Sequence, residues 1–417
     1  MPSAPDSPLN LPTLDDLDVE NRRVFVRVDF NVPLKGSEVR DDSRIRATLP
    51  TLQRLRERGA RLILASHLGR PDGAVDLKYS MEPVGLRLAE LLNCEVRLPD
   101  EVVGDGVTKL VLDTRAQQVV LLENLRFHPG ETKNDPAFAQ ALANLAEAYV
   151  NDAFGASHRA HASVVGVPRL INAKAAGLLL AAETQALGRV VHHPAHPFVM
   201  IIGGAKVSDK LPVLIATLGR LKDGDSILIG GAMANTFLAA KGLELGASLH
   251  EPDRLADCRS LLTRAAARGI RVILPTDLRL GRGLKASAAR IIRVGDGDDA
   301  GIPDDEMALD VGPDTEIRFA SAIRNAKMVF WNGPMGLFEN PLFAEGTLSL
   351  ARAVAACPGF TVVGGGDSVA AIQDSGVANQ INHISTGGGA SLEMIEGKTL
   401  PGVEALLPHS GHPGRSS

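Results

Sequence analysis

The stretch 199–210, V-M-I-I-G-G-A-K-V-S-D-K, constrains the fold of this chain more than any other. Its first four residues are apolar without alternation, as in a strand buried on both faces of a parallel sheet. Gly203 and Gly204 let the backbone turn sharply and approach a ligand closely. A helix that begins here would direct its free N–H groups and its positive dipole end at that ligand. The pattern therefore predicts a strand, a glycine turn and a helix N-terminus that suit a bound phosphate.

Two lysines strengthen this interpretation. Lys206 and Lys210 are separated as i and i+4, so they would lie on one face of the helix. Lysine is rarer than arginine in this chain, and its compact charge can follow a moving phosphoryl group. From this stretch alone, an ordinary turn before a solvated basic helix is the alternative, because glycine turns before helices are common in α/β proteins.

Length and composition favour an enzyme with several domains. A chain of 417 residues is too long for one hydrophobic core and indicates two or three domains. The formal charge of −5 disfavours nucleic-acid and anionic-membrane partners, so a bound anion needs a local basic cluster. The 3 cysteines are widely spaced and indicate neither a disulfide framework nor a zinc site. Without a targeting signal or a bilayer-spanning apolar run, we expect a cytoplasmic protein.

Strand-like and helix-like segments alternate along the chain. Strands are expected at 23–28, 62–66, 119–122, 149–151, 198–202, 226–229, 272–274, 328–330 and 360–363. Segment 43–58 is expected to be a helix that Pro50 kinks or restarts, and Asp135 with Pro136 predicts another helix start. Residues 173–191 are expected to form a single helix. Alternating units of this size predict parallel sheets covered by helices on both faces.

The alternation breaks at 192–197, H-H-P-A-H-P. We therefore expect two doubly wound, Rossmann-like parallel-sheet domains joined by a helix, with the second domain starting near Pro197. The three histidines could bind a metal, but the prolines disrupt a helical ligand face, and we interpret the segment as a solvated linker. The polar tail 409–417 is expected to be disordered.

Polar residues follow the expected strands of the first half, where open α/β sheets bind ligands. These segments are Asp29-Phe30-Asn31, His67-Leu68-Gly69-Arg70, 123–126 and 152–154, the last leading to 158–161. Arg70, Arg126 and Arg159 thus follow three separate strands, and Arg44 begins the segment after the first. Such guanidinium groups would repel one another unless a multiply charged anion lay among them. Each arginine alone is more often a surface charge, and His161 could equally be a core or capping histidine.

Glycine-rich corners follow the expected strands of the second half. They are Gly203-Gly204-Ala205-Lys206, 230–232, Asn332-Gly333-Pro334 and Gly364-Gly365-Gly366-Asp367-Ser368, with a further glycine run at 387–389. Several such corners on one sheet edge suit a nucleotide, whose base and phosphates need close backbone approach. Asp367 could cap the next helix, hold a magnesium ion, or do both.

The sequence contains only partial matches to several other known motifs. There is no G-x-x-x-x-G-K-[ST], which excludes a Walker-type ATPase. The sequence 281–286 imitates a dinucleotide fingerprint weakly, and 296–301 starts like a calcium loop but has Met307 at its twelfth position. The sequence 366–370 resembles a nucleophile elbow, so a hydrolase with Ser368 as nucleophile is the competing hypothesis. His383 is the only histidine between it and the tail, and no triad is evident.

Ordered motifs along most of the chain resemble the phosphoglycerate kinase family. They are R-V-D-F-N-V-P (27–33), S-H-L-G-R-P (66–71), E-N-L-R-F (123–127), H-R-A-H (158–161), G-G-A-K-V-S-D-K (203–210), W-N-G-P-M-G-L-F-E (331–339), G-G-G-D-S (364–368) and S-T-G-G-G-A-S-L-E (385–393). The resemblance runs from about 22 to 407. It implies an N-terminal domain for 3-phosphoglycerate or 1,3-bisphosphoglycerate, residues 1–176 with 399–417, a hinge helix at 177–191, and a domain at 192–398 for ADP or ATP with Mg²⁺.

The same resemblance assigns residues to both sites. The expected phosphoglycerate contacts are Asp29, Phe30, Asn31, Arg44, His67, Leu68, Gly69, Arg70, Arg126, Arg159 and His161. The expected nucleotide contacts are Gly203, Gly204, Lys206, Lys210, Asn332, Glu339, Gly364, Gly365, Gly366, Asp367 and Ser368. Within this set, Glu339 would meet the ribose and Asp367 the metal. Two departures from the family pattern are Met335, where a second proline is usual, and Ala247, where lysine is common.

The implied chemistry needs no general base, because a substrate carboxylate is already ionised at neutral pH. Catalysis would then depend on alignment and on neutralising the phosphoryl group in transfer, for which we expect Arg44, Lys206 and Lys210. The two domains would close to bring the substrates together and exclude water. We expect a monomer. A protein that binds nucleotide without catalysis is a further alternative.

Overall fold

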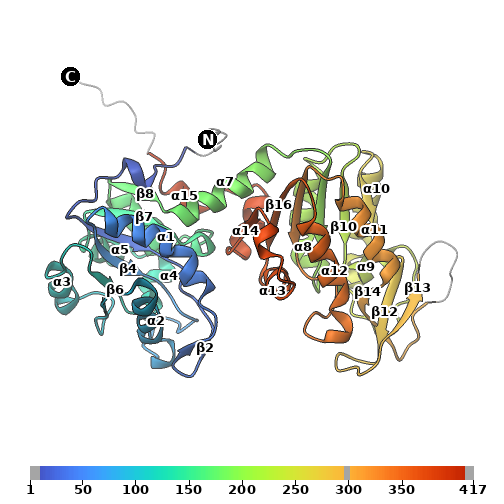
Figure 1. Ribbon diagram of the computed structural model, residues 1–417, viewed down its shortest axis with the longest axis horizontal. Coiled ribbons are helices and arrows are strands. Elements are labelled where there is room, and N and C mark those ends of the chain that lie inside the picture. Colours follow the sequence, from blue (N-terminus) through green and yellow to red (C-terminus); the bar gives the residue numbers. More distant parts are fainter. Residues whose placement is uncertain (1–9, 295–300, 409–417) are drawn as a thin grey trace, which may run out of the picture. The chain divides into compact units, whose positions relative to one another are not determined.

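Two α/β units make up the protein in the computed structural model, which describes residues 10–294 and 301–408 (Figure 1). One unit comprises residues up to Gln185 together with those from Thr399 onward, and the other runs from Ala186 to Lys398. The expected disordered tail 409–417 and, apart from Gly301, the calcium-loop candidate 296–301 lie outside the described residues. Among the described residues, no helix is both long and apolar enough to cross a membrane.

The first unit contains a six-stranded sheet in the order β5-β6-β4-β1-β7-β8, with all pairs parallel. Its strands are β1 (Arg23–Arg27), β4 (Arg61–Ala65), β5 (Val96–Arg97), β6 (Val119–Leu121), β7 (Ala148–Asn151) and β8 (Lys174–Ala176). The helices are α1 (Ser43–Glu57), α2 (Glu82–Leu92), α3 (Asp105–Leu112), α4 (Gly130–Lys133), α5 (Pro136–Ala143), α6 (Val167–Leu170) and α15 (Pro401–Glu404). The strand order reverses between β1 and β7, and a ligand site is expected beyond their carboxyl ends.

The second unit contains a parallel sheet in the order β11-β10-β9-β15-β16-β17. Its strands are β9 (Phe198–Ile202), β10 (Ser226–Ile229), β11 (Arg271–Ile273), β15 (Met328–Asn332), β16 (Phe360–Gly364) and β17 (His383–Ile384). The helices are α8 (Val207–Leu218), α9 (Ala232–Ala240), α10 (Leu255–Ala266), α11 (Pro313–Ile323), α12 (Glu345–Ala355), α13 (Gly366–Asp374) and α14 (Gly389–Ile395). The order reverses between β9 and β15, as in dinucleotide-binding folds.

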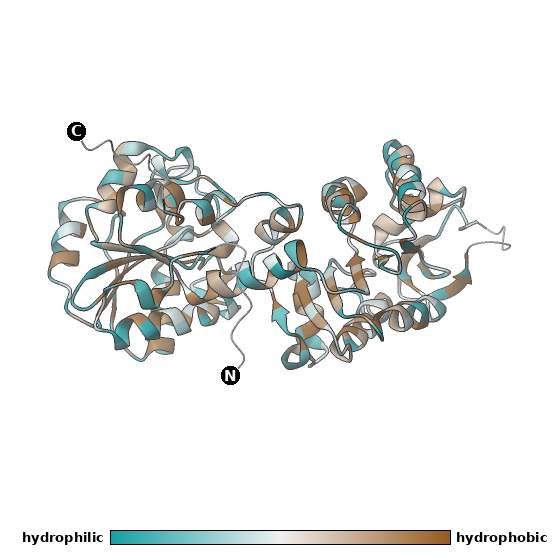
Figure 2. Cartoon of the chain, turned by 90° about the horizontal axis from the view of Figure 1, so that it is seen from above, coloured by the Kyte–Doolittle hydropathy of each residue, from teal (hydrophilic) through white to brown (hydrophobic). Residues whose placement is uncertain are grey.

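Both sheets are built from apolar strands covered by amphipathic helices. Every residue of β9 and β15 is buried, which explains why β9 is apolar throughout and β15 is apolar up to its last residue, Asn332. Figure 2 shows hydrophobic and hydrophilic residues alternating around the covering helices. α5 begins as expected, because the Asp135 side chain accepts a hydrogen bond from the Phe138 N–H and Pro136 follows it. The expected fold class, two doubly wound parallel-sheet domains, is confirmed.

The single helix expected at 173–191 is wrong at its start. Residues Lys174–Ala176 form β8, which pairs with β7, and α7 (Leu178–His192) begins only after Gly177. The Asp152 carboxylate accepts hydrogen bonds from the N–H groups of Leu179 and Leu180, so α7 is capped from another strand end. The boundary between the two units falls within α7. The predicted domain limits and the hinge at 177–191 stay predictions.

α1 runs through Pro50 as one continuous helix, so it does not restart there; Ile45, Leu52 and Leu55 anchor its buried face on both sides of the proline. Two other details differ from expectation. An antiparallel sheet of β12 (Asp277–Gly281), β13 (Arg290–Arg293) and β14 (Met307–Val311) was not expected. The linker at 192–197 is not simply solvated, since His196 Nδ1 lies 2.8 Å from the buried Asp225 Oδ2.

Candidate active site

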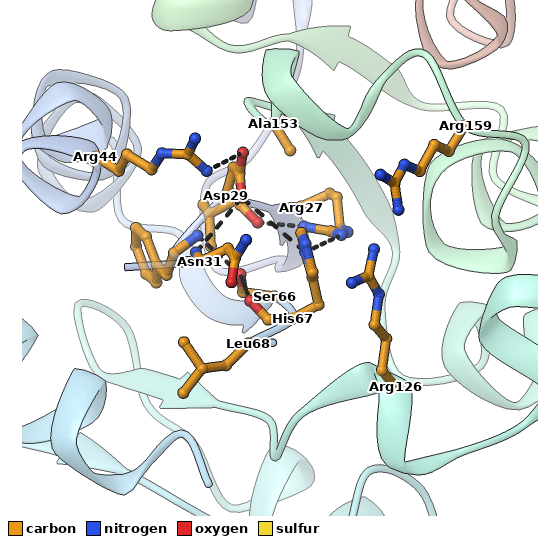
Figure 3. A network of polar contacts seen from close by, with 12 residues as sticks. Arg27, Asp29, Asn31, Arg44, Ser66, His67, Leu68, Arg126, Ala153 and Arg159 are labelled. Atoms are coloured by element: carbon orange, nitrogen blue, oxygen red, sulfur yellow. Dashed lines mark hydrogen bonds and ion pairs between the residues drawn. The ribbon is translucent and has the colours of Figure 1, made fainter. Parts of the chain in front are cut away.

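The carboxyl end of β1 carries the first polar cluster (Figure 3). Asp29 follows β1, and its Oδ2 accepts a hydrogen bond from Arg44 Nη1 of α1 at 3.0 Å. Asn31 Oδ1 accepts one from the Gly69 N–H at 3.0 Å, which joins the ends of β1 and β4. These contacts bring together the expected residues of two strand ends and one helix.

Three arginines from separate strand ends line one cavity of this unit. The cavity has a volume of about 470 Å³ and is lined by Arg70, Asp72, Gly73, Arg126, Pro129, Thr132, Lys133 and Arg159. Arg126 is held by a hydrogen bond from Nη1 to the Gly69 carbonyl at 2.7 Å, and its Nε is buried with no hydrogen-bond partner among the described residues. Burial, together with the charges of Arg159 and Arg27, lowers the pKa of Arg126 to about 10. An anion in this cavity would reduce the repulsion between the guanidinium groups and would accept a hydrogen bond from Arg126 Nε.

Two buried histidines border the arginines and are biased toward their neutral forms. Burial, then the charges of Arg27 and Arg126, lowers the pKa of His67 well below its usual value. The same causes lower the pKa of His161 to about 4. Neutral imidazoles add no further repulsion to a site that already carries several positive charges. Because the neutral forms of both imidazoles are favoured, they are suited to forming hydrogen bonds rather than ion pairs with a bound anion.

Arg27, in β1, belongs to this cluster but was missed from the sequence. Its guanidinium is fully buried, donates from Nε to Ser163 Oγ at 2.8 Å, and lies 3.2 Å from His67 Nδ1 through Nη2. Ser163 in turn donates to the buried Glu131 at 2.6 Å, which supplies the opposite charge. A charged residue at the end of an apolar strand was the available signal. In contrast, the side chains of Phe30 and Leu68 are packed in the hydrophobic core.

The glycine turn after β9 forms the centre of the second cluster. α8 begins at Val207, so Lys206 occupies the preceding N-cap position in extended conformation instead of lying within the helix as expected. Lys206 is exposed, whereas Lys210 is half-buried and donates from Nζ to Asn332 Oδ1. A Cβ on Gly203 would lie 2.1 Å from the Pro334 carbonyl oxygen, so only glycine permits this close approach.

A cavity of about 290 Å³ lies at these corners. It is lined by Gly203, Gly204, Ala205, Lys210, Asn332, Gly333, Pro334, Gly365, Gly366, Asp367, Gly388 and Leu392. The Nδ2 of Asn332 is buried and has no hydrogen-bond partner among the described residues. Burial lowers the pKa of Lys210, while Asp209 and Asp367 act in the opposite direction. Backbone, lysine and amide donors therefore converge where a phosphate chain would fit.

The expected helix cap at Asp367 is wrong. α13 begins at Gly366 with Gly365 as its N-cap, and the positive φ of 94° at Gly365 makes the turn that Asp367 was expected to make. Asp367 instead lies exposed in the first turn, where its carboxylate is favoured by the helix dipole. The next residue, Ser368, is buried, and its Oγ accepts a hydrogen bond from the Gly333 N–H at 2.7 Å.

An apolar cavity of about 230 Å³ adjoins the phosphate-sized one and shares Gly204, Ala205, Pro334 and Asp367 with it. Its other walls include Leu249, Leu278, Leu284, Met307, Leu309 and Met335, and Glu339 lies at its lining. A flat apolar ligand with an adjoining polar group would fit such a space. Sequence reasoning missed most of this wall, since its residues are far apart in the chain and carry no motif.

Comparison with known proteins decides the family. The family model for phosphoglycerate kinase matches residues 14–398. The phosphoglycerate kinase of Anaeromyxobacter sp. strain K is 53% identical over 398 residues, 95% of this chain and 99% of that protein, and that of Thermomicrobium roseum is 52% identical over 396 residues, again 95% and 99%. The chain belongs to the phosphoglycerate kinase family.

Solved structures of family members agree with this assignment. Phosphoglycerate kinase from Coxiella burnetii superposes with a TM-score of 0.84 at 36% identity, covering 95% of this chain and 98% of that one. The enzyme from Pyrococcus horikoshii OT3 gives 0.83 at 32% identity, also covering 95% and 98%. As a member of this family, the protein is a kinase, a glycolytic phosphotransferase whose substrates are ATP or ADP and a phosphoglycerate.

Two questions left open by the sequence can be addressed within this family. The hydrolase hypothesis required an available Ser368 hydroxyl, but that residue is buried and its oxygen fixes the Gly333 backbone. The departure at Met335 lies in the wall of the apolar cavity, where its thioether packs against Gly230 and Gly203. Nothing in the structure explains the departure at Ala247.

Proposed function

We propose that this phosphoglycerate kinase binds phosphoglycerate at the arginine cavity of the first unit and ATP or ADP at the glycine-rich corners of the second. The observation that carries the proposal is that each site contains a buried donor without a hydrogen-bond partner among the described residues, Arg126 Nε in one and Asn332 Nδ2 in the other. A buried N–H without an acceptor costs about 1–3 kcal/mol, which a bound anion would recover. The roles of the residues assigned to the two sites by resemblance follow from this division.

In the proposed reaction, a carboxylate oxygen of 3-phosphoglycerate attacks the γ-phosphorus of ATP. The new O–P bond forms while the bond to the bridging β–γ oxygen breaks, and that electron pair leaves on ADP. No proton is transferred, so no general base is needed. The reverse reaction moves the same phosphoryl group from 1,3-bisphosphoglycerate to ADP.

The enzyme's contribution is then positioning and charge neutralisation. Arg70, Arg126 and Arg159 would hold the phosphate of the phosphoglycerate, and Arg44 would lie at its carboxylate. Lys206 has no hydrogen bond or ion pair to another side chain among those described for this chain, so its ammonium is available to the transferring group. Lys210, fixed by Asn332, would neutralise the phosphate chain of the nucleotide.

Mg²⁺ fits the second site. No group of three or more His, Cys, Asp or Glu residues suited to a metal occurs among the described residues, and Mg²⁺ typically binds through one or two carboxylates with substrate phosphates. Asp367 is an exposed carboxylate that lines the phosphate-sized cavity, so it would hold the ion. The bound ion would supply charge neutralisation between the phosphates. We further propose that the protein is cytoplasmic and monomeric. Analytical ultracentrifugation can test the oligomeric state.

The decisive experiment is a coupled assay for ATP-dependent formation of 1,3-bisphosphoglycerate from 3-phosphoglycerate. We expect turnover that requires both substrates and stops on chelation of Mg²⁺. A protein that binds nucleotide without turnover would instead be a binding protein. Cleavage of acyl esters that is lost in Ser368→Ala would favour the hydrolase.

A further inference from the structure

The loop after β15, residues 333–340, forms part of both cavities of the nucleotide site. Pro334 lines both of them, and Met335, Gly336, Leu337 and Glu339 line the apolar one. Its backbone also holds the other glycine corners, since the carbonyls of Pro334 and Met335 accept hydrogen bonds from the N–H groups of Gly204 and Gly231 at 3.0 and 2.9 Å. The position of this loop therefore sets the shape of the nucleotide site.

Asp310, in β14, packs against the 333–340 loop. Its side chain is fully buried, and Oδ2 accepts a hydrogen bond from the Gly346 N–H of α12 at 2.8 Å while Oδ1 accepts one from the Val311 N–H at 2.9 Å. The loop packs directly on this carboxylate: a Cβ on Gly336 would lie 2.2 Å from Oδ1. The preceding residue of β14, Leu309, accepts a hydrogen bond from the Leu337 N–H at 2.7 Å.

The charge of Asp310 is poorly compensated for so deep a position. Its nearest cation is Arg279, whose Nε lies 3.8 Å from Oδ2 and is itself buried without a hydrogen-bond partner among the described residues. Arg279 makes its closer ion pair with Glu316, at 2.6 Å. Burial raises the pKa of Asp310, while the N–H groups of Gly346 and Val311 act in the opposite direction. These two N–H groups and the packing of Gly336 fix the orientation of the side chain, so its contribution is to geometry.

Thr347, also in α12, provides the second anchor. Its side chain is fully buried, and Oγ1 accepts a hydrogen bond from the Met335 N–H at 3.0 Å. Asp310 and Thr347 thus connect β14, the start of α12 and the 333–340 loop. Neither residue belongs to the sequence motifs from which the nucleotide site was predicted.

We propose that Asp310 and Thr347 are positioning residues for nucleotide binding, which hold the 333–340 loop against the two cavities of the second unit. The inference rests on the proposed nucleotide site. Neither side chain takes part in phosphoryl transfer. Asp310 is itself among the residues that line the apolar cavity, but its side chain is fully buried, so it acts, like Thr347, through the loop that carries Pro334, Met335 and Glu339. Loss of either anchor should therefore weaken nucleotide binding without affecting the phosphoglycerate site, which is built entirely from the other unit.

The test is Asp310→Asn, with steady-state KM values measured for both substrates. The amide turns one of the two acceptors into a donor facing a backbone N–H, and we expect KM for ATP to rise about tenfold. KM for 3-phosphoglycerate should stay within about twofold, because a defect confined to binding leaves the other substrate unaffected. Direct titration with ADP should show the same loss of affinity.

Asp277→Asn is the matched control. Asp277 is also a buried carboxylate of the antiparallel sheet and accepts N–H groups at the start of a helix, those of Asp314 and Thr315 at 2.9 and 2.8 Å, but no contact joins it to the 333–340 loop among those described. It should lose a similar amount of stability with little change in nucleotide KM. Equal rises in both variants would overturn the proposal, because the effect would then come from the sheet as a whole.

If Asp310→Asn does not fold, Thr347→Val decides. Valine keeps the shape but removes the acceptor for the Met335 N–H, so we expect nucleotide KM to rise about fivefold, and Thr347→Ser should restore it. An unchanged nucleotide KM in Thr347→Val, or no rescue by serine, would overturn the proposal. An inactive wild-type enzyme would refute the proposed function instead, so the two failures are distinguishable.

Discussion

Arg44 Nη1 lies 3.0 Å from Asp29 Oδ2, so the arginine expected to neutralise the transferred phosphoryl group is oriented by a carboxylate from the neighbouring strand end. In Arg44→Ala this charge is lost at the proposed position of the reacting carboxylate. We predict that kcat falls by about 10²–10³, the usual effect of removing one donor to a transition-state charge. Steady-state kinetics with both substrates at saturation measures this directly.

Arg46→Ala is its control. Arg46 is on the same helix, is more exposed and pairs with Asp42 at 2.8 Å in a surface ion pair. Such pairs contribute about 0–1 kcal/mol to stability and none to the site. A similar loss of kcat in both variants would remove Arg44 from the mechanism.

Lys206 is predicted to act in transfer more than in binding. It is exposed at the N-cap of α8, and within the described part of the chain no side-chain partner would fix it before substrate arrives. Lys206→Ala should lower kcat by about 10²-fold or more while changing substrate KM by only a few-fold. Lys222→Ala, an exposed lysine of the same unit, should be unaffected. If kcat is unchanged in Lys206→Ala, the lysine does not contribute to catalysis.

Asp367→Asn should raise the Mg²⁺ concentration needed for half-maximal activity by at least about tenfold. The amide keeps one oxygen but loses the charge that a hard divalent cation prefers. Asp374→Asn provides a control, because Asp374 is exposed at the last residue of the same helix. The measurement is activity against free Mg²⁺ at fixed total ATP. Coincident curves for wild type and Asp367→Asn would exclude Asp367 as a metal ligand.

Domain closure is predicted from the chemistry, because the two proposed binding sites belong to different units while transfer needs the substrates in contact. Small-angle scattering should show a smaller radius of gyration with 3-phosphoglycerate and a non-hydrolysable ATP analogue together than with either alone. An unchanged radius with both ligands bound would contradict closure and the expected hinge at 177–191.

The sequence was most informative where function demands particular residues at strand ends. The glycines after β9 and β16 and the arginines after three strands of the first unit were placed correctly relative to their strands, because a buried parallel strand followed by a turn has a recognisable pattern. The edge strands β5, β8 and β17 were missed. β5 and β17 have two residues each and carry no periodicity, and β8 lies within the segment 173–191 that was expected to be a helix; all three are fixed by pairing with a neighbour.

Contacts between distant segments could not be predicted. The burial of Arg27 depends on its hydrogen bond to Ser163, which in turn donates to Glu131. Neither partner can be located from β1 alone. Asp310 and Thr347 act through the backbone of a loop that is remote from Asp310 in sequence, so no local motif marks them. The helix cap was assigned to Asp367 instead of Gly365, because Gly365 makes the turn with a positive φ that only the folded backbone reveals.

The last prediction concerns acid stability and follows from His161. Burial and the nearby arginines lower the pKa of His161 to about 4, whereas an unfolded histidine titrates at about 6.5. Between these values the unfolded state binds a proton that the folded state does not, so the free energy of unfolding falls as pH decreases from about 6.5 toward 4. The loss attributable to His161 is about 3 kcal/mol when the full interval is crossed, and about 2 kcal/mol at pH 5. His67, whose pKa is lowered in the same direction, adds to this loss of stability.

Denaturant unfolding of ligand-free protein at pH 7.5 and pH 5 should therefore show a smaller pH-dependent loss in the free energy of unfolding in His161→Asn than in wild type. Identical losses in the two proteins would show that His161 does not resist protonation in the folded state.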